Sequence, residues 1–193
     1  MPSSPLASPG ATRAALERYG LATKHRLGQN FLVDDNVVRR IIELARPTDA
    51  DAVVEVGPGL GTLTHALLGT VTSIEADREL EPVLADIAGA RPGFSFVMGD
   101  ALRVGPDDVS AANGGTAPTM LVSNLPYNVA ATIILAVFEG WPSVRSATVM
   151  VQAEVADRIC AAPGSRTYGA YTAKLALRGR PSGRFEVSPR CFM

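Results

Sequence analysis

The sequence predicts an open α/β fold with a mostly parallel sheet and helices on both of its faces. Short apolar runs alternate with segments of helical periodicity, which is the pattern of βαβ units. Polar and glycine-rich stretches follow several of these runs, where folds of this kind bind their ligands. The chain has 193 residues, 47% of them hydrophobic and 19% charged, which suits one large globular domain.

Apolar runs are expected to form the strands of the sheet. The first of them ends at Gly57, where a turn begins. The expected strands cover residues 53–56, 71–75, 94–98, 120–123 and 147–151, and residues 184–187 are a candidate sixth strand.

Helical segments are expected between and around these strands. Asp34 and Asp35 are placed to cap a helix that Pro47 ends, and Asp77 and Asn128 are placed to cap two others. The expected helices are 35–45, 79–87, 129–138, 152–160 and 168–177. Residues 110–119 contain Asn-Gly-Gly and are expected to form a surface loop.

The N-terminal residues 1–23 are expected to be a mostly disordered extension, because Pro, Ser and Gly dominate their first half. They lack the apolar core of a signal peptide. The longest apolar run, residues 129–138, is too short to span a bilayer. Two cysteines, Cys160 and Cys191, make neither a disulfide framework nor a metal set, so a reducing cytoplasm is the expected location.

The net charge of −1 conceals a strong pattern along the chain. Residues 1–46 carry +3, residues 47–144 carry −9 and residues 145–193 carry +5. If the two basic ends meet in space, they form a positive rim around an acidic centre, which suits a polyanion such as RNA. Scattered charge on a solvated surface would give the same totals.

A glycine-rich turn, Glu55-Val-Gly-Pro-Gly-Leu-Gly61, follows the first strand and is expected to lead into a helix. Gly57 and Gly59 allow a tight turn and the close approach of a ligand to the backbone. The spacing fits a dinucleotide fingerprint poorly, because Thr62 stands where a third small residue is needed. A plain βα turn would also account for the glycines.

Acidic residues follow the next two strands. Glu75, at the end of the second strand, is placed to accept hydrogen bonds from ribose hydroxyls. Asp100, after the third strand, is placed to accept a hydrogen bond from the amine of an adenine. Glu75 could instead belong to an exposed acidic cluster with Asp77 and Glu79, and Asp100 could cap a helix. All these features fall at the carboxyl ends of consecutive strands, where an open α/β sheet binds its ligand.

The fourth strand leads into Asn124-Leu-Pro-Tyr-Asn128. The Asn124 side-chain oxygen and the Leu125 carbonyl could accept both hydrogens of an exocyclic amine, while Pro126 fixes the backbone. Tyr127 offers a face on which a base can stack. A simple turn would also use Asn and Pro.

These motifs together resemble the ribosomal RNA adenine dimethyltransferases. The glycine turn is similar to that of S-adenosylmethionine-dependent methyltransferases, and Asn-Leu-Pro-Tyr is similar to the (N/D)-P-P-(Y/F) motif of amino-methyltransferases. Gly28-Gln-Asn-Phe-Leu32, residues 150–158 and Tyr168-Gly169 resemble further segments of the family. The resemblance runs from about Lys24 to Phe192 and implies a Rossmann-like class I methyltransferase fold.

The resemblance also implies roles for individual residues. Those expected to contact S-adenosylmethionine are Asn30, Leu32, Gly57, Gly59, Glu75, Asp100 and Asn124. Those expected to hold the target adenine are Asn124, Leu125, Pro126, Tyr127 and Phe192, the last as an aromatic residue on the other side of the base. No metal is expected, because the sulfonium methyl group is already electrophilic.

The implied activity is methylation of N6 in two adjacent adenosines of a hairpin loop near the 3′ end of small-subunit rRNA. The products would be N6,N6-dimethyladenosine and S-adenosylhomocysteine. The implied partner is a pre-ribosomal small subunit, and the enzyme is expected to be a monomer. Residues 24–193 would be the catalytic domain, incomplete at its C-terminal end and without the family's C-terminal helical domain. A resistance methylase of large-subunit rRNA, a non-catalytic RNA-binding fragment and a dinucleotide oxidoreductase are the alternatives.

Overall fold

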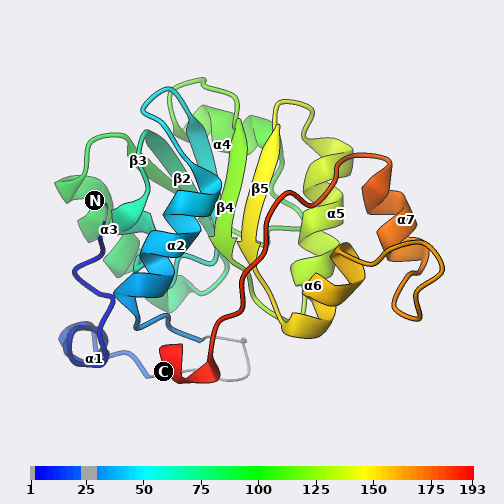
Figure 1. Cartoon of the computed structure of the whole chain (residues 1–193). Helices are drawn as coiled ribbons and strands as arrows, with labels where there is room; N and C mark the ends of the chain where they lie inside the picture. The colour runs from blue at the N-terminus through cyan, green and yellow to red at the C-terminus, as the bar shows by residue number, and fades with distance from the viewer. Residues whose placement is uncertain (1–2, 23–29) are drawn as a thin grey trace.

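A computed structural model of the chain describes residues 3–22 and 30–193. Its centre is a parallel sheet with strand order β3-β2-β1-β4-β5 (Figure 1). The strands are β1 (Ala52–Val56), β2 (Thr70–Glu75), β3 (Phe94–Met98), β4 (Met120–Asn124) and β5 (Ser146–Met150). The expected open α/β fold and all five main strands are confirmed, with bounds that differ by one residue at most.

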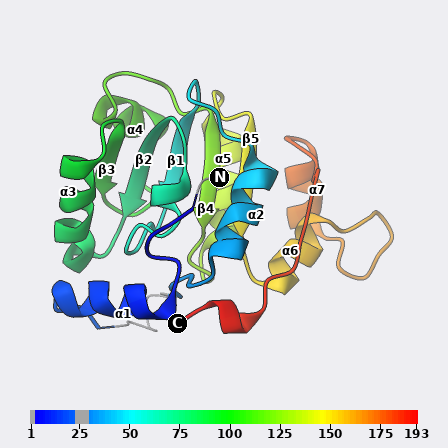
Figure 2. The same ribbon diagram turned by 60° about the vertical axis from the view of Figure 1, so that its left-hand side comes forward.

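Helices cover both faces of the sheet (Figure 2). The α-helices of the described residues are α1 (Pro9–Arg18), α2 (Asp35–Ala45), α3 (Glu81–Ala90), α4 (Pro106–Ala112), α5 (Ala130–Gly140), α6 (Ala153–Ile159) and α7 (Ala170–Ala176). Short 3-10 turns are η2 (Thr64–Ala66), η3 (Arg78–Leu80) and η4 (Pro189–Cys191). One apolar cluster joins α1, α2 and α3 to one face, and another joins α4 and α5 to the other.

The strand β1 shows how the sequence builds two cores from one sheet. Its five residues are all buried, and neighbouring side chains point to opposite faces. Val53 packs in the cluster beneath α2, whereas Val54 and Val56 pack in the cluster beneath α5. A central parallel strand therefore needs apolar residues on both sides, which explains its continuous Val-rich run.

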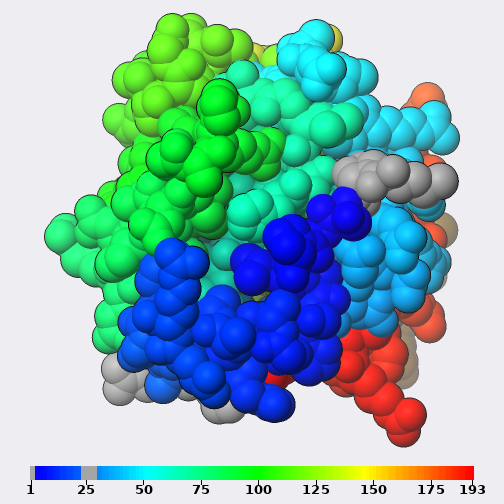
Figure 3. Space-filling view, turned by 90° about the vertical axis from the view of Figure 1, so that its left-hand side faces the viewer, coloured from blue at the N-terminus to red at the C-terminus, as the bar shows by residue number. Residues whose placement is uncertain are grey.

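The N-terminal extension corrects one expectation. Residues 9–18 form the helix α1, with Ser8 as its N-cap and Pro9 in its first turn, and not the expected disordered tail. Leu16 of α1 is buried in the core, and Arg18 and Tyr19 both bond to Asp86 of α3. The helix lies flat against the body of the molecule (Figure 3). Burial of its apolar side outweighs the flexible composition of the segment.

Four local expectations were wrong. The glycine turn leads only into the 3-10 turn η2, and the segment between the positive-φ glycines 61 and 69 forms no α-helix. Residues 106–112 form α4, so the loop begins later than expected. Asn128 is exposed and does not cap α5, whose N-cap is Val129. Residues 184–187 form no strand.

Within residues 3–22 and 30–193, no helix has the length and apolar character needed to cross a membrane.

Candidate active site

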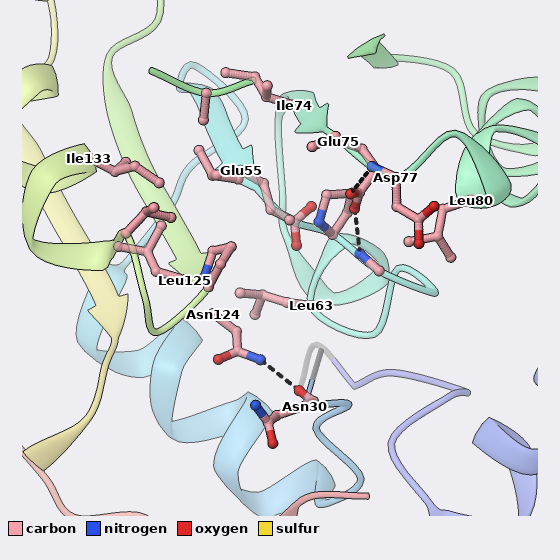
Figure 4. Close-up of a pocket in the computed structure, with 18 of the residues that line it drawn as sticks. Asn30, Glu55, Leu63, Ile74, Glu75, Asp77, Leu80, Asn124, Leu125 and Ile133 are labelled. Carbon is pink, nitrogen blue, oxygen red and sulfur yellow. Dashed lines mark hydrogen bonds between the residues drawn. The ribbon is translucent and has the colours of Figure 1, made fainter. Parts of the chain in front are cut away.

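A pocket of about 260 Å³ opens at the carboxyl ends of β1, β2 and β4 (Figure 4). It brings together residues that lie far apart in the sequence. All of the residues expected to contact the cofactor line it: Asn30, Leu32, Gly57, Gly59, Glu75, Asp100 and Asn124. Leu125 and Pro126 line it as well, whereas Tyr127 and Phe192 stand outside its lining.

The glycine turn forms the floor of this pocket. Gly57 and Gly59 have φ values of +67° and +59°, in the left-handed region that side chains disfavour. A Cβ atom on Gly57 would meet the ring of Pro126 at 3.4 Å, and one on Gly59 would meet the Phe31 ring at 3.1 Å. Both positions therefore favour glycine for their backbone shape, and position 59 favours it also because a Cβ atom there would crowd the Phe31 ring.

Glu75 ends β2 with its carboxylate beside the glycine turn. The side chain is buried, unlike the exposed Glu79 and Glu81, so it does not belong to an exposed acidic cluster. Its Oε1 accepts a hydrogen bond from the Asp77 amide at 2.9 Å, and its Oε2 accepts one from the Gly59 amide at 3.4 Å. Burial raises the pKa of Glu75, and these amides partly oppose the rise.

Asp100 lies at the exposed rim of the pocket, just after β3. Its Oδ1 accepts a hydrogen bond from the Leu102 amide at 2.9 Å, so the side chain fixes a turn. No α-helix starts there, because α4 begins at Pro106. Capping a turn and lining the pocket are compatible, since a carboxylate has several acceptor sites.

Glu55 is a pocket residue that the site predictions omitted. It is only 2% exposed, and its Oε2 accepts hydrogen bonds from the hydroxyls of Thr64 at 2.6 Å and Ser73 at 2.9 Å. Burial raises the pKa of Glu55 to about 7, although both hydroxyls lower it. The signal in the sequence was an acid within the apolar run Val-Val-Glu-Val, where a charge is costly without a purpose.

Asn124 stands at the end of β4, facing the glycine turn. The preceding residue fixes this position, because the buried Ser123 hydroxyl donates to the Val56 carbonyl of β1 at 2.6 Å. The Asn124 Nδ2 donates to the Asn30 carbonyl at 3.1 Å, which the amide can do only with its nitrogen on that side (Figure 4). Its Oδ1 is buried and has no partner among the described residues.

The two aromatic residues expected around the target base lie outside the pocket lining. Tyr127 follows Pro126 and is half-buried, and burial raises the pKa of its hydroxyl. Phe192 lies opposite Leu32 in an antiparallel bridge, and Leu32 lines the pocket. Each aromatic residue is therefore next to a lining residue. The other parts of the expected cofactor segment, Gly28 and Gln29, lie outside the described residues.

The described ranges hold no group of three or more His, Cys, Asp or Glu side chains that could bind a metal ion. The polar groups that face the pocket are carboxylates, backbone amides and one carboxamide. This donor and acceptor set fits a neutral or cationic organic ligand with hydroxyl and amino groups.

The sheet, its strand order and a pocket between a glycine turn and an Asn-Leu-Pro-Tyr turn define a Rossmann-like methyltransferase of class I. The similar solved structures agree with this fold. A dimethyladenosine transferase from Plasmodium falciparum has a TM-score of 0.62 at 24% identity, with 75% of this chain and 51% of that chain covered. The 23S rRNA methyltransferase ErmE has a TM-score of 0.58 at 30% identity, with 68% and 51% covered.

The sequence comparisons narrow this class to one family. The family model described as "Ribosomal RNA adenine dimethylase" matches residues 20–177. The chain therefore belongs to the ribosomal RNA adenine dimethylase family. Ribosomal RNA small subunit methyltransferase A of Nocardia farcinica is 47% identical over 183 residues, and that of Kineococcus radiotolerans is 45% identical over 197 residues. The matches cover 90% and 98% of this chain, and 60% and 63% of the relatives.

The chain thus spans about 60% of the length of the curated relatives that it matches.

Proposed function

We propose that the protein transfers methyl groups from S-adenosylmethionine to N6 of two adjacent adenosines in a hairpin loop near the 3′ end of small-subunit rRNA. The products are N6,N6-dimethyladenosine and S-adenosylhomocysteine. The proposal extends to a pre-ribosomal small subunit as the partner, a monomeric enzyme and a cytoplasmic location. Family membership supports the chemistry, and the names of the bacterial relatives support the small-subunit target.

The observation that carries the proposal is the buried Oδ1 of Asn124. A buried acceptor without a partner costs about 1–3 kcal/mol, so its presence at a pocket wall calls for a ligand that donates to it. The neighbouring Asn30 carbonyl holds the amide nitrogen and fixes which end faces the ligand. An exocyclic amine is such a donor, and the amine of adenine has two hydrogens to give.

The side of the pocket proposed to bind the methyl donor suits the adenosyl and methionine parts of S-adenosylmethionine. In our proposal Glu75 accepts from the ribose hydroxyls, and Asp100 at the rim accepts from the amine of the cofactor's adenine. The backbone at Gly57 and Gly59 lets the ligand lie close to the turn. Asn30 and Leu32 close the pocket from the opposite wall. The bound cofactor supplies an electrophilic methyl group.

The target side of the pocket prepares the nucleophile. The lone pair of an adenine amine is delocalised into the ring, so the free base reacts poorly. Hydrogen bonds from the amine to Asn124 Oδ1 and the Leu125 carbonyl favour a pyramidal nitrogen whose lone pair can point at the methyl group. Tyr127 and Phe192 hold the base from its two faces, and Pro126 fixes the turn that carries these groups.

Alignment of the two reactants then accounts for most of the rate, up to about 7–11 kcal/mol of the barrier. The base must leave its stack to enter the pocket, which costs least in a flexible loop.

A large-subunit resistance methylase is the second candidate, because the structure of ErmE is similar at 30% identity. The relatives named for the small subunit are 41–47% identical, which favours the first candidate. A non-catalytic RNA-binding fragment is the third candidate, and the Asn124 acceptor argues against it.

The test uses labelled S-adenosylmethionine with undermethylated small ribosomal subunits and, separately, large-subunit RNA. We expect label only on small-subunit RNA, and dimethyladenosine as the modified nucleoside in mass spectrometry. S-adenosylhomocysteine should raise the melting temperature of the chain, and NAD should not. Stabilisation by NAD alone would reject the methyltransferase reading. Label confined to large-subunit RNA would identify a resistance methylase.

A further inference from the structure

Residues 183–193, which we call the C-terminal strap, run from the side of α7 in front of the sheet to the pocket edge (Figure 1). They contain only the short turn η4, yet they are packed along their length against the first half of the chain. The strap ends beside residues 30–33, which we call the pocket wall because residues 30–32 line the pocket.

The strap and the pocket wall are joined by backbone hydrogen bonds. Phe31 and Met193 exchange two of them, with N–O distances of 3.1 and 2.9 Å, and the Val33 amide donates to the Cys191 carbonyl at 2.8 Å. Between these pairs, Leu32 stands opposite Phe192 in the close, non-hydrogen-bonded position of an antiparallel ladder. The pocket wall therefore depends on the strap for its backbone partners.

Contacts outside the pocket hold the strap in its path. The guanidinium of Arg40 on α2 lies 4.1 Å from the centre of the Phe185 ring, and Arg184 pairs with Asp157 on α6 at 2.8 Å. A Cβ atom on Gly183 would come within 2.5 Å of Leu44, so the strap lies directly on α2 there. Arg40 and Phe185 do not line the pocket.

The pocket wall in turn holds the group proposed to bind the target amine. The carbonyl of Asn30, one residue before Phe31, accepts the hydrogen bond of the Asn124 amide. This single bond decides which end of that amide carries the unpartnered oxygen. Arg40 and Phe185 are thus connected to Asn124 through the backbone of the strap and its hydrogen bonds to the pocket wall.

We propose that the C-terminal strap is a positioning element for the transfer reaction, with Phe185 and Arg40 as its positioning residues. By holding the pocket wall, the strap fixes the shape of the cofactor side and the orientation of the Asn124 amide together. This inference rests on the proposed function for its chemical meaning. It implies that cofactor binding at the pocket wall and base binding at Asn124 stabilise each other.

The test uses the 193-residue chain and four single substitutions on or beside α2. Phe185→Ala and Arg40→Ala each remove the cation–π contact from one side, and Phe185→Tyr retains it. Arg39→Ala is the matched control, because Arg39 lies on the same helix and, among the described residues, bonds to Asp35 and Asn36 and not to the strap. Hydrogen exchange of individual amides is measured by NMR, and S-adenosylhomocysteine affinity by calorimetry.

We expect Phe185→Ala and Arg40→Ala to speed amide exchange at Phe31 and Val33 and to weaken S-adenosylhomocysteine binding by about 2- to 5-fold. The amides of β1 should exchange at their original rates, and Phe185→Tyr and Arg39→Ala should resemble the unsubstituted chain.

Unchanged exchange at Phe31 and Val33 in both alanine variants would overturn the inference. Faster exchange with unchanged affinity would also overturn it, because the strap would then be a structural fastening without influence on the pocket. If the unsubstituted chain does not bind S-adenosylhomocysteine, the proposed function fails, while the exchange data still report on the link between strap and wall.

Discussion

The two halves of the pocket are built in different ways. The proposed cofactor half consists of the glycine turn and Glu75, whose carboxylate accepts hydrogen bonds from the backbone amides of Gly59 and Asp77. The proposed target half consists of Asn124 to Tyr127, and its deciding bond joins Asn124 to the Asn30 carbonyl of the pocket wall, 94 positions away in the chain. The first half is complete by itself, whereas the second retains a buried oxygen without a partner.

This difference separates binding from chemistry. In the proposed cofactor half, the polar groups already have hydrogen-bond partners within the chain. This half is therefore preorganised before any ligand binds, which suits tight binding. In the proposed target half, the Asn124 Oδ1 has no partner among the described residues and can accept a hydrogen bond from the reacting group, which suits catalysis. Substitutions in the two halves should therefore change different measured quantities.

The largest effect is expected for Asn124→Ala in the target half. Loss of the acceptor should lower kcat by about 100- to 1000-fold, as loss of one preorganised hydrogen bond does in other active sites. S-adenosylhomocysteine affinity, measured by calorimetry, should change much less. If Asn124→Ala lowered S-adenosylhomocysteine affinity and kcat by equal factors, the proposed division of the pocket into a cofactor half and a target half would be rejected.

A pH dependence is expected from Glu55 in the cofactor half. The folded chain keeps a proton on Glu55 up to about pH 7, while the unfolded chain releases it near 4.5. The unfolded state therefore binds fewer protons between these values, and the free energy of unfolding falls as pH rises, by about 3 kcal/mol from this group.

In Glu55→Gln, the side chain does not titrate but can still accept from Thr64 and Ser73. Urea unfolding at several pH values should show a flatter profile for this variant than for the original chain. Parallel profiles would mean that Glu55 is ionised throughout, and that the cofactor half carries a buried charge.

Stacking at Tyr127 should give the next effect. Tyr127→Ala should lower kcat/KM for RNA by about 10- to 100-fold, because stacking on an aromatic face is worth about 1–3 kcal/mol per base. Tyr127→Phe should retain most of the activity, since the ring and not the hydroxyl makes the contact. Equal losses in both variants would assign the role to the hydroxyl.

The smallest effect is expected for Glu75→Gln in the cofactor half. Replacing the carboxylate by an amide should weaken S-adenosylhomocysteine binding by about 10-fold, because hydrogen bonds to a charged acceptor are stronger than those to a neutral one. The variant's kcat at saturating cofactor should stay close to its original value. Unchanged affinity would reject the ribose contact.

The sequence predicts the cofactor half better than the target half. Glycines, Glu75 and Asp100 follow strands whose apolar runs are recognisable, and parallel strands bring their carboxyl ends to one edge. The bond between Asn124 and Asn30 has no signal in local spacing. The contact between the strap and the pocket wall has none either, because the candidate strand at residues 184–187 does not form and the strap contains only the short turn η4.

Two of the errors in the fold have different causes. The helix α1 is stabilised by Leu16 and by Asp86 on α3, contacts that composition does not reveal. For α4 a local signal existed, since Pro106 stands at its first position and Asp108 accepts from the Gly105 amide at 2.8 Å. The first error reflects tertiary contacts, and the second an overlooked cap.

Gly57 faces the ring of Pro126 where the two halves meet, since a Cβ atom on Gly57 would lie 3.4 Å from that ring. The boundary between the two halves therefore consists of a pyrrolidine ring on one side and bare backbone on the other. In the proposed reaction the methyl donor and the target base would meet across this boundary, so a side chain added at residue 57 would enter the space between the two loops.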